Sequence, residues 1–233
     1  VVRINSGTVN GNTFWYVGGN GPLNVGTSAI TWLTANAGFQ SQQGIATLFT
    51  AIPSLRFSGA TQIFTLGYST AGFGAGTYTK WTGAALPSWG QGVWWTTDAD
   101  GVVWQLSAEQ PRVSQFGAVG DGSRPYLTIT ATGTDDLDAF HRGAAWCYLY
   151  RKKALYTEPR TFFVSNTIQL GGFGTGGVSS FHGVSLIGLS PFAWGGTGSW
   201  DGQRYPATCI VTNNADRPCI AISSGRGIAV KDI

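Results

Sequence analysis

Acidic residues are missing from the first 97 positions of the chain, where Arg3, Arg56 and Lys80 are the only charged side chains. Over the whole chain, charged residues make up 11%, less than half of the usual share of about 25%. Aromatic residues make up 13%, and this combination excludes intrinsic disorder, which requires many charges and few aromatic rings. The net charge of +3 is too small to indicate a nucleic-acid partner.

Two further absences narrow the class of protein. The sequence has no run of about 18 apolar residues, so we expect no membrane span. It has only three cysteines, Cys147, Cys209 and Cys219, and none of them forms a C-x-x-C motif. An odd number of cysteines without metal-ligand spacing indicates structural thiols in a reduced protein, with no metal and no cofactor.

Tryptophan is frequent in the region that lacks acidic residues, which contains Trp15, Trp32, Trp81, Trp89, Trp94 and Trp95. Depletion of charge together with enrichment of aromatic side chains is typical of the centre of a protein interface. This region is therefore predicted to be covered by a partner. A simpler alternative stays open, in which a neutral β-domain is kept soluble by its Ser, Thr, Asn and Gln side chains.

Glycine is abundant, at 35 of 233 residues, and indicates a β protein with many tight turns. Apolar runs separated by glycine-rich turns predict strands over 1–9, 12–17 and 23–33. A short helix is predicted over 40–51, with Pro53 ending it. Residues 56–106 return to strands and glycine turns. We therefore divide this half of the chain into a β-module at 1–55 and a β-rich connecting module at 56–110.

One longer helix is predicted from Thr134 onward. Thr134 is a suitable N-cap, and Asp135 and Asp136 follow in the first turn, where the helix dipole favours negative charge. Cations at 151–153 stand near the C-terminal end, where positive charge is favoured. An apolar stripe with helical spacing runs between them, made of Leu137, Phe140, Ala144 and Tyr148.

Short apolar runs bounded by Gly, Pro, Asn or Asp follow the helix, at 162–170, 184–189, 209–213, 219–223 and 228–233. Such strands suit a β-sandwich or a parallel β-solenoid, and the Asn213-Asn214 corner favours the solenoid. A solenoid needs a capped end, because an open strand edge invites aggregation. The last run has no cap after it, so we expect the strand pattern to continue beyond Ile233.

Two stretches around the helix start resemble a known signature. Residues 116–122, FGAVGDG, match F-G-A-x-G-D-G, and residues 135–140 match D-D-T-x-A-F/I with Leu137 in place of Thr. They resemble the start of the pectate-lyase-like right-handed β-helix of bacteriophage tailspikes and tail-fibre depolymerases. An insertion at 123–134 departs from the pattern. The matching residues are Phe116, Gly117, Ala118, Gly120, Asp121, Gly122, Asp135, Asp136, Ala139 and Phe140.

Two upstream stretches resemble parts of phage tail proteins. Residues 66–83 are similar to a G-Y-x-x-x-G-D-G-G-G-x-F-x-W module that tailspikes carry before the β-helix, with Phe73 and Ala75 in place of its usual Asp and Gly. Residues 1–35 are similar to small β-modules near the N-termini of phage tail proteins. Bacterial pectate-lyase-like enzymes share the motif at 116–140 and usually lack both upstream elements.

The resemblance implies a mainly β fold, in which small N-terminal β-modules precede a leading α-helix and the first coils of a right-handed parallel β-helix at 111–233. It implies a homotrimeric receptor-binding protein of the virion tail, assembled in the cytoplasm of the bacterial host. Residues 1–110 would attach to the phage tail, the baseplate or another tail protein. The downstream β-helix would bind host surface polysaccharide, and in a depolymerase cleave it. The alternative is a bacterial pectate-lyase-like enzyme that degrades polysaccharide.

No catalytic site and no metal site are predicted within the chain. Glycosidases use two facing carboxylates, whereas Asp121 is interpreted as a turn residue and Asp135 and Asp136 as charges at a helix N-terminus. One stretch would suit a sugar because aromatic rings flank a carboxylate, and it contains Trp194, Trp200, Asp201 and Tyr205. An ordinary structured loop is the simpler interpretation of that stretch.

Overall fold

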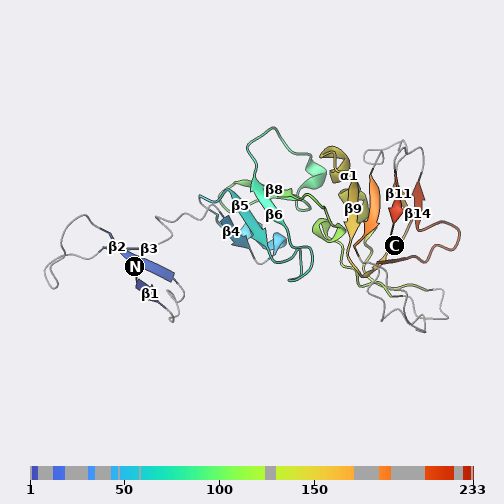
Figure 1. Cartoon of the computed structure of the whole chain (residues 1–233), viewed down its shortest axis with the longest axis horizontal. Coiled ribbons are helices and arrows are strands. Elements are labelled where there is room, and N and C mark those ends of the chain that lie inside the picture. Colours follow the sequence, from blue (N-terminus) through green and yellow to red (C-terminus); the bar gives the residue numbers. More distant parts are fainter. Residues whose placement is uncertain are drawn as a thin grey trace.

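The structure is a computed structural model of the chain and describes residues 2–4, 13–18, 31–34, 43–46, 48–57, 59–123, 130–170, 184–189, 208–222, 228–231 and 233. Within these ranges the protein is mainly β (Figure 1), and its only α-helix there is α1. The strands form one small antiparallel sheet, one mixed sheet and a set of short parallel sheets.

The small sheet is antiparallel and has the order β1-β2-β3, formed by β1 Val2–Ile4, β2 Thr13–Gly18 and β3 Thr31–Thr34. Trp15 in the central strand lies opposite Val2 on one side and Thr34 on the other. Each of the three strands overlaps one of the runs predicted between residues 1 and 33, so the turn and strand signals of this region are confirmed.

The mixed sheet has the order β4-β5-β6-β8-β7, formed by β4 Gln43–Ala46, β5 Gln62–Thr65, β6 Thr77–Lys80, β7 Trp95–Thr97 and β8 Val103–Ser107. β4 and β5 are parallel, and the other neighbours are antiparallel. Because β4 pairs with β5, this sheet extends across position 55, where the sequence analysis divides the first two modules.

The helix predicted over 40–51 is wrong. Residues 43–46 form β4, and only a short 3-10 helix, η2 Phe49–Ser54, follows it, with Pro53 inside rather than after it. Gly44 lowers the helix propensity of the segment, and pairing with β5 satisfies its backbone as a strand. Phe49 and Ile52 of η2 are buried, so the apolar residues of this stretch serve packing under the sheet.

Aromatic rings form the core of the mixed sheet. Phe49 stacks on Tyr78 of β6 with 4.9 Å between ring centroids, and on Tyr68 with 5.1 Å. Ile63 of β5 and Leu106 of β8 are buried around them. Stacked aromatic pairs contribute about 0.5–1.5 kcal/mol each beyond the burial of their surface, so η2 is held firmly against the sheet.

The tryptophans of this module are covered largely by the chain itself. Trp94 has no exposed surface, and Trp81, Trp89 and Trp95 are partly buried. The partner predicted from the aromatic content is thus not needed to explain these four side chains. The other two tryptophans of the region, Trp15 and Trp32, have side chains that lie outside the described part.

The longer predicted helix is confirmed as α1 Leu137–Leu149. The N-cap prediction is wrong, because Asp136 occupies the N-cap position and Thr134 donates its hydrogen bonds to Asp121 instead. The predicted stripe is correct for Phe140 and Ala144, which are buried. It fails at Tyr148, whose side chain is exposed.

Every strand pair that the structure describes after α1 is parallel. β12 pairs with β9 and with β15, β13 pairs with β10, and β14 pairs with β11. β9, β10 and β11 therefore pair in chain order with β12, β13 and β14, and this parallel pairing argues against the antiparallel β-sandwich. The strands are β9 Ala154–Thr157, β10 Thr161–Phe163, β11 Ile168–Leu170, β12 Ser185–Gly188, β13 Cys209–Val211, β14 Ile220–Ile222 and β15 Val230–Lys231.

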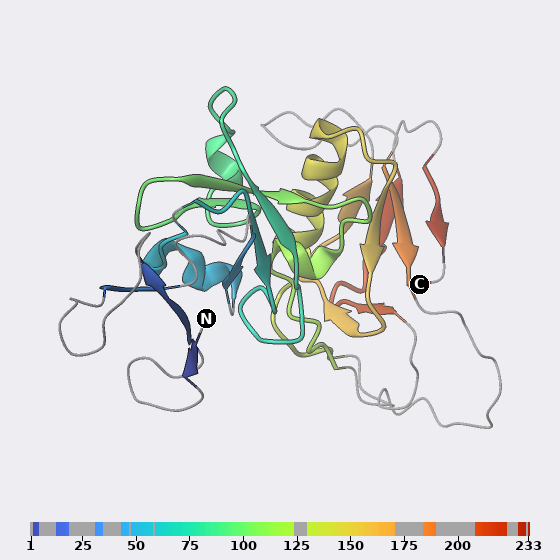
Figure 2. The same cartoon turned by 60° about the vertical axis from the view of Figure 1, so that its left-hand side comes forward.

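Like side chains face each other across these parallel pairs. Leu155 lies opposite Leu186, and Ile168 lies opposite Ile220. Figure 2 shows α1 running alongside these strands, between them and the mixed sheet. Phe140 of α1 packs edge-on against Phe162 of β10, with 5.5 Å between ring centroids, and both are fully buried. The helix thus covers the interior of the parallel strands with its apolar face.

The predicted apolar runs are confirmed as strand positions with shorter bounds. The run at 162–170 divides into β10 and β11, because residues 164–167 turn the chain between them. β9 was not predicted, since ALYT follows directly on the cations at 151–153 without a turn residue before it. It is nevertheless paired along its full length with β12.

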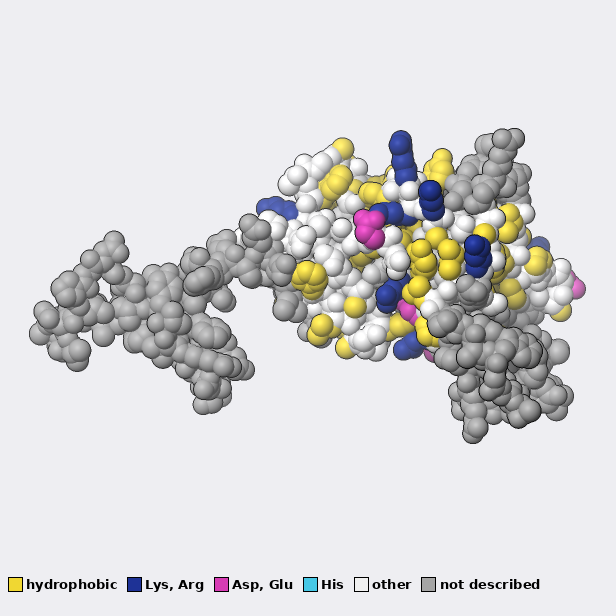
Figure 3. All heavy atoms as spheres, in the orientation of Figure 1, with side chains coloured by type: hydrophobic (Ala, Val, Ile, Leu, Met, Phe, Trp, Pro, Cys, Tyr) yellow, Lys and Arg dark blue, Asp and Glu magenta, His cyan; other side chains and the backbone are white. Residues whose placement is uncertain are grey.

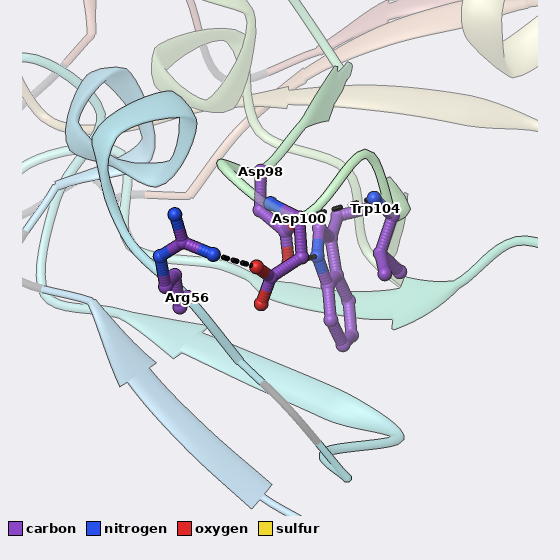
Figure 4. Close-up of polar contacts among 5 residues, drawn as sticks. Arg56, Asp98, Asp100 and Trp104 are labelled. Atoms are coloured by element: carbon purple, nitrogen blue, oxygen red, sulfur yellow. Dashed lines mark hydrogen bonds and ion pairs between the residues drawn. The ribbon is translucent and has the colours of Figure 1, made fainter.

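Asp98, the first acidic residue of the chain, is buried and holds the turn between β7 and β8 (Figure 4). Its Oδ1 accepts hydrogen bonds from the backbone N–H of Asp100 at 2.9 Å and of Val102 at 3.0 Å. Its Oδ2 accepts the indole N–H of Trp104 at 2.9 Å. Trp104 is fully buried, so its N–H needs this acceptor. The neighbouring Asp100 forms an exposed ion pair with Arg56.

We predict that Asp98→Asn lowers the free energy of unfolding by about 1–3 kcal/mol, because one donor group of the amide must then face the N–H of Trp104 or of the turn. Asp100→Asn removes only the exposed ion pair with Arg56 and should cost less than about 1 kcal/mol. Urea unfolding of the two variants measures the difference. Equal losses would show that Asp98 does not hold the turn.

Candidate functional site

The residues of the predicted motif meet where the chain passes from the mixed sheet into the parallel strands. The 3-10 helix η4 Val113–Phe116 ends at Gly117, which has a φ of 100°. Gly120 also has a positive φ of 63°, so the turn after η4 uses two left-handed positions that favour glycine. Phe116 and Ala118 are buried between these turns and α1. The sequence thus folds this segment into a tight corner next to the N-terminus of α1.

Asp136 bonds this corner to the start of α1. Its Oδ1 accepts the N–H of Val119 at 2.7 Å, and its Oδ2 accepts the N–H of Gly120 at 3.1 Å. Its own N–H donates to the carbonyl of Phe163 in β10 at 2.8 Å. One buried residue therefore joins the corner, the helix and the first set of parallel strands.

Asp121 and Asp135 make similar bonds on either side. Asp121 accepts the N–H of Thr134 at 2.7 Å and its hydroxyl at 2.9 Å, which closes the loop formed by the insertion. Asp135 accepts the N–H of Leu137 at 3.1 Å and that of Ser165 at 3.0 Å. All three carboxylates of the motif are thus acceptors for backbone N–H groups.

The segment at 112–121, which precedes α1, also pairs in parallel with the strands that follow the helix. Arg112 forms a parallel bridge to Tyr156 of β9, and Asp121 forms one to Thr161 of β10. Close packing explains why position 122 of the motif is glycine. A Cβ there would lie 2.7 Å from the backbone nitrogen of Phe163. The segment that carries the motif therefore lies against β9 and β10 through isolated parallel bridges.

The pKa values of Asp135 and Asp136 are shifted in opposite directions, but the two carboxylates do not form a catalytic acid–base pair. Burial raises the pKa of Asp136 to about 6, although its two backbone hydrogen bonds act in the opposite direction. Partial burial works against ionisation of Asp135, but hydrogen bonds from Ser165 and Leu137 hold its pKa below the ordinary value. A pKa near neutral is typical of catalytic acids, yet both oxygens of Asp136 are engaged by the backbone. The geometry assigns these residues a structural role.

The remaining predicted site residues divide into two groups. Ala139 and Phe140 are buried on α1, as members of the core. The stretch considered for sugar contact, Trp194, Trp200, Asp201 and Tyr205, lies outside the described residues. In the described ranges, no group of three His, Cys, Asp or Glu side chains is arranged to bind a metal ion. None of the helices in these ranges has the length and hydropathy needed to cross a membrane.

A loop of the mixed sheet, residues 67–76, docks on η4. The Nε2 of Gln115 donates to the carbonyl of Ala75 at 2.8 Å, and the ring of Tyr68 packs near Gly117. Arg160, after β9, places its guanidinium carbon 4.0 Å from the ring centroid of Phe73. The loop that resembles a tailspike module therefore contacts the predicted motif directly.

A row of aromatic rings reinforces this junction. Trp94 of the mixed sheet meets Tyr150 with 5.6 Å between ring centroids, and Tyr150 meets Trp146 of α1 with 4.8 Å. Trp146 in turn lies 5.8 Å from Phe116. These contacts join the mixed sheet, α1 and the motif into one core, because most of the rings are buried.

Several residues of the junction were missed from the sequence. Gln115, Tyr150 and Arg160 had no motif of their own. Glu158 also had no motif, yet it accepts a hydrogen bond from the hydroxyl of the fully buried Ser114, and burial raises its pKa. One sequence signal could have predicted this junction. The stretch at 66–83 and the motif at 116–140 both resemble parts of tailspikes, and they follow each other in the order in which tailspikes carry them.

No family model matches the chain, and no curated protein matches it. Solved structures that it resembles are phage tailspike proteins. One is the full-length tailspike protein 2 of Escherichia coli O157:H7 bacteriophage CAB120, with 17% identity and a TM-score of 0.46 over 81% of this chain and 20% of that chain. Another is the tailspike protein of Acinetobacter baumannii phage AM24, with 11% identity and a TM-score of 0.41 over 80% of this chain and 33% of that chain.

The chain thus spans a minor part of the length of both proteins. Similarity at these values does not define a family. The geometry described above has to carry any functional conclusion.

The first test of the site uses the pH dependence of Asp136. Its pKa in the folded protein, about 6, lies above the ordinary value of 3.8, so its protonation favours folding. This contribution is complete below pH 3.8 and is lost as the pH rises through 6. We predict that the stability advantage of the wild type over Asp136→Asn shrinks between pH 4 and pH 7, as measured by urea unfolding.

Asp216→Asn is the matched control, because Asp216 is exposed and its one described hydrogen bond is donated by its backbone N–H to Asn214. It should leave the pH dependence of the wild type nearly unchanged. An advantage over Asp136→Asn that grows from pH 4 to pH 7 would contradict the role assigned to burial.

The second test compares two glycines of the docking loop. Gly72 and Gly74 have positive φ values of 86° and 76°, so alanine is strained by a similar amount at both, about 1–2 kcal/mol. Only at Gly74 would the new Cβ clash, 2.5 Å from the carbonyl oxygen of Ser114, whereas nothing lies within 4 Å at Gly72. We predict that Gly74→Ala costs about 1–3 kcal/mol more than Gly72→Ala in urea unfolding. Equal costs would mean that the loop does not pack on η4.

Proposed function

We propose that the chain is the N-terminal region of a phage tailspike or tail fibre, which attaches a trimeric host-receptor-binding protein to the virion tail. One observation carries the proposal. The F-G-A-x-G-D-G and D-D segments, which resemble the tailspike signature, come together through Asp136 and introduce a set of parallel strands. A chance match in sequence would have no reason to meet in space at such a junction.

We interpret the parallel strands as the first coils of a right-handed β-helix. β9, β10 and β11 would form one coil, β12, β13 and β14 the next, and β15 would begin a third. The pairing of each strand with its counterpart in the following set supports this interpretation. α1 would close the first coil, since its apolar face covers the interior at Phe162 and Leu155.

The proposed division of labour follows the modules. Residues 1–110 would bind the tail, the baseplate or another tail protein, and the β-helix that begins at 111 would lead to the part that binds host surface polysaccharide. The junction between loop 67–76 and η4 supports this division, because it fixes the direction of the β-helix relative to the attachment side. A spike that must point away from the virion needs such a fixed angle.

The full protein could be a depolymerase, but residues 1–233 are proposed to have no polysaccharide-degrading activity of their own. A glycosidase requires two accessible carboxylates that face each other. The carboxylates of Asp98, Asp121, Asp135 and Asp136 are used by backbone or indole donors instead.

The proposal predicts that purified residues 1–233 join tail particles of the encoding phage that were assembled without their spikes, and block later attachment of the complete spike. Analytical ultracentrifugation should show trimers of the complete protein. Incubation of the 1–233 chain with host capsule should release no reducing ends. A chain that never binds the particles, or that cleaves the capsule, would overturn the proposed function.

A further inference from the structure

The C-terminal end of α1 has a backbone geometry that usually calls for glycine. The N–H of Lys152 donates to the carbonyl of Cys147 at 2.7 Å, and the N–H of Arg151 donates to that of Tyr148 at 3.2 Å. This pair of bonds is the Schellman motif, whose residue after the cap is left-handed and is most often Gly. Here that residue is Arg151, with a φ of 53°, and it is the only described residue other than glycine with a positive φ.

Large apolar side chains are exposed just before this cap. Tyr148 is 53% exposed and Leu149 is 46% exposed, although the next ring, Tyr150, turns inward to Trp94 and Trp146. The helix therefore does not hide its last turn, even though an aromatic core lies one residue away. An exposed Tyr next to an exposed Leu is the kind of surface that binds another protein.

Positive charge surrounds these apolar side chains. Arg151 and Lys153 are exposed, and Lys152 forms an ion pair with Glu109 at 3.1 Å. The three cations and the single anion leave a local charge of +2. Figure 3 shows basic and hydrophobic side chains next to each other on the face that carries α1.

Helix-end electrostatics alone do not account for Arg151. Cations favour a helix C-terminus by about 0.3–1 kcal/mol, and Lys152 and Lys153 already provide them. A left-handed position costs a residue with a Cβ about 1–2 kcal/mol, and glycine would avoid that cost. Backbone strain that is retained at an exposed residue with a long side chain indicates that the side chain has a function, such as binding.

We infer that Tyr148, Leu149, Arg151 and Lys153 form a docking surface for a protein segment that presents apolar side chains beside acidic ones. Charge selects this partner. A second copy using the same surface would bring like charges together, which is unfavourable. A sugar ligand would need hydrogen-bonding side chains such as Asn or Asp around the ring, whereas Leu149 stands beside Tyr148 here. This inference does not depend on the proposed function.

The strain can be tested apart from binding. Arg151→Gly should raise the melting temperature of the full chain by roughly 2–4 °C, because the left-handed position is then relaxed. Arg217→Gly is the control, since Arg217 is an exposed cation in the turn before β14. A melting temperature that falls on Arg151→Gly would overturn the argument from strain.

Binding can be tested with a random dodecapeptide library selected on the full chain, followed by fluorescence anisotropy of the enriched peptides. We expect peptides that combine Asp or Glu with aromatic or aliphatic residues. Their Kd should rise about 10-fold for Tyr148→Ser/Leu149→Ser and about 3-fold for Arg151→Gly. The controls Leu66→Ser and Arg217→Gly, which change an exposed apolar residue and a cation elsewhere, should leave it unchanged.

Three results would overturn the inference. The first is a selection without enrichment, or one whose peptides bind the Tyr148→Ser/Leu149→Ser variant as well as the wild type. The second is polygalacturonate, an acidic polysaccharide, displacing the peptides, which would assign the surface to a sugar. The third is self-association of the chain that Tyr148→Ser/Leu149→Ser abolishes, which would make a second copy the partner.

Discussion

The requirement that buried backbone N–H groups find acceptors governs the centre of this protein. The corner after η4 turns sharply through two left-handed glycines, and the partly buried N–H groups of Val119 and Gly120 donate to a side chain instead of a neighbouring strand. An unpaired buried N–H costs about 1–3 kcal/mol, so the corner is stable only with an acceptor at that place. Asp136 supplies both acceptors, and its own N–H fixes β10 through Phe163.

A second consequence concerns the relation between the two halves of the described chain. The loop at 67–76 and the ring of Trp94 reach from the mixed sheet to η4 and to Tyr150. Polar, cation–π and aromatic contacts thus act over the same short junction. Interfaces between domains of one chain are often small and mobile, whereas this one shares a core with α1. In the proposed role, an attachment module joined in this way would orient everything that follows it.

The sequence predicted the parts of the fold whose signals are local. The helix α1 has a regular apolar stripe, and most strands after it lie in runs bounded by turn residues. The 40–51 segment was mispredicted because its apolar residues have helical spacing, while its strand pairing with β5 depends on residues nearly 20 positions away. β9 was not predicted for a similar reason, since only its pairing with β12 identifies it as a strand.

The site shows the same division between local and distant information. The sequence indicated a turn role for Asp121 and helix N-terminal charges at Asp135 and Asp136, but the N–H groups from which they accept hydrogen bonds could not be read from their spacing. Thr134 is a residue type that often caps helices, but its N–H and hydroxyl donate to Asp121 instead. The docking partners Gln115 and Arg160 carry no pattern at all, because a hydrogen bond to a distant carbonyl or a cation over a ring needs no fixed neighbour in sequence.

The parallel pairing also bears on how such a chain can change over evolutionary time. β12 pairs in parallel with β9, which precedes it in the chain, and with β15, which follows it. In the proposed β-helix, coils could therefore be gained, lost or exchanged by recombination far from the junction, while the corner at Asp136 and the contacts of loop 67–76 stay as they are. Under the proposed function, such a boundary would let one attachment module carry different receptor-binding parts, so that a change of host would leave the contacts at the junction unchanged.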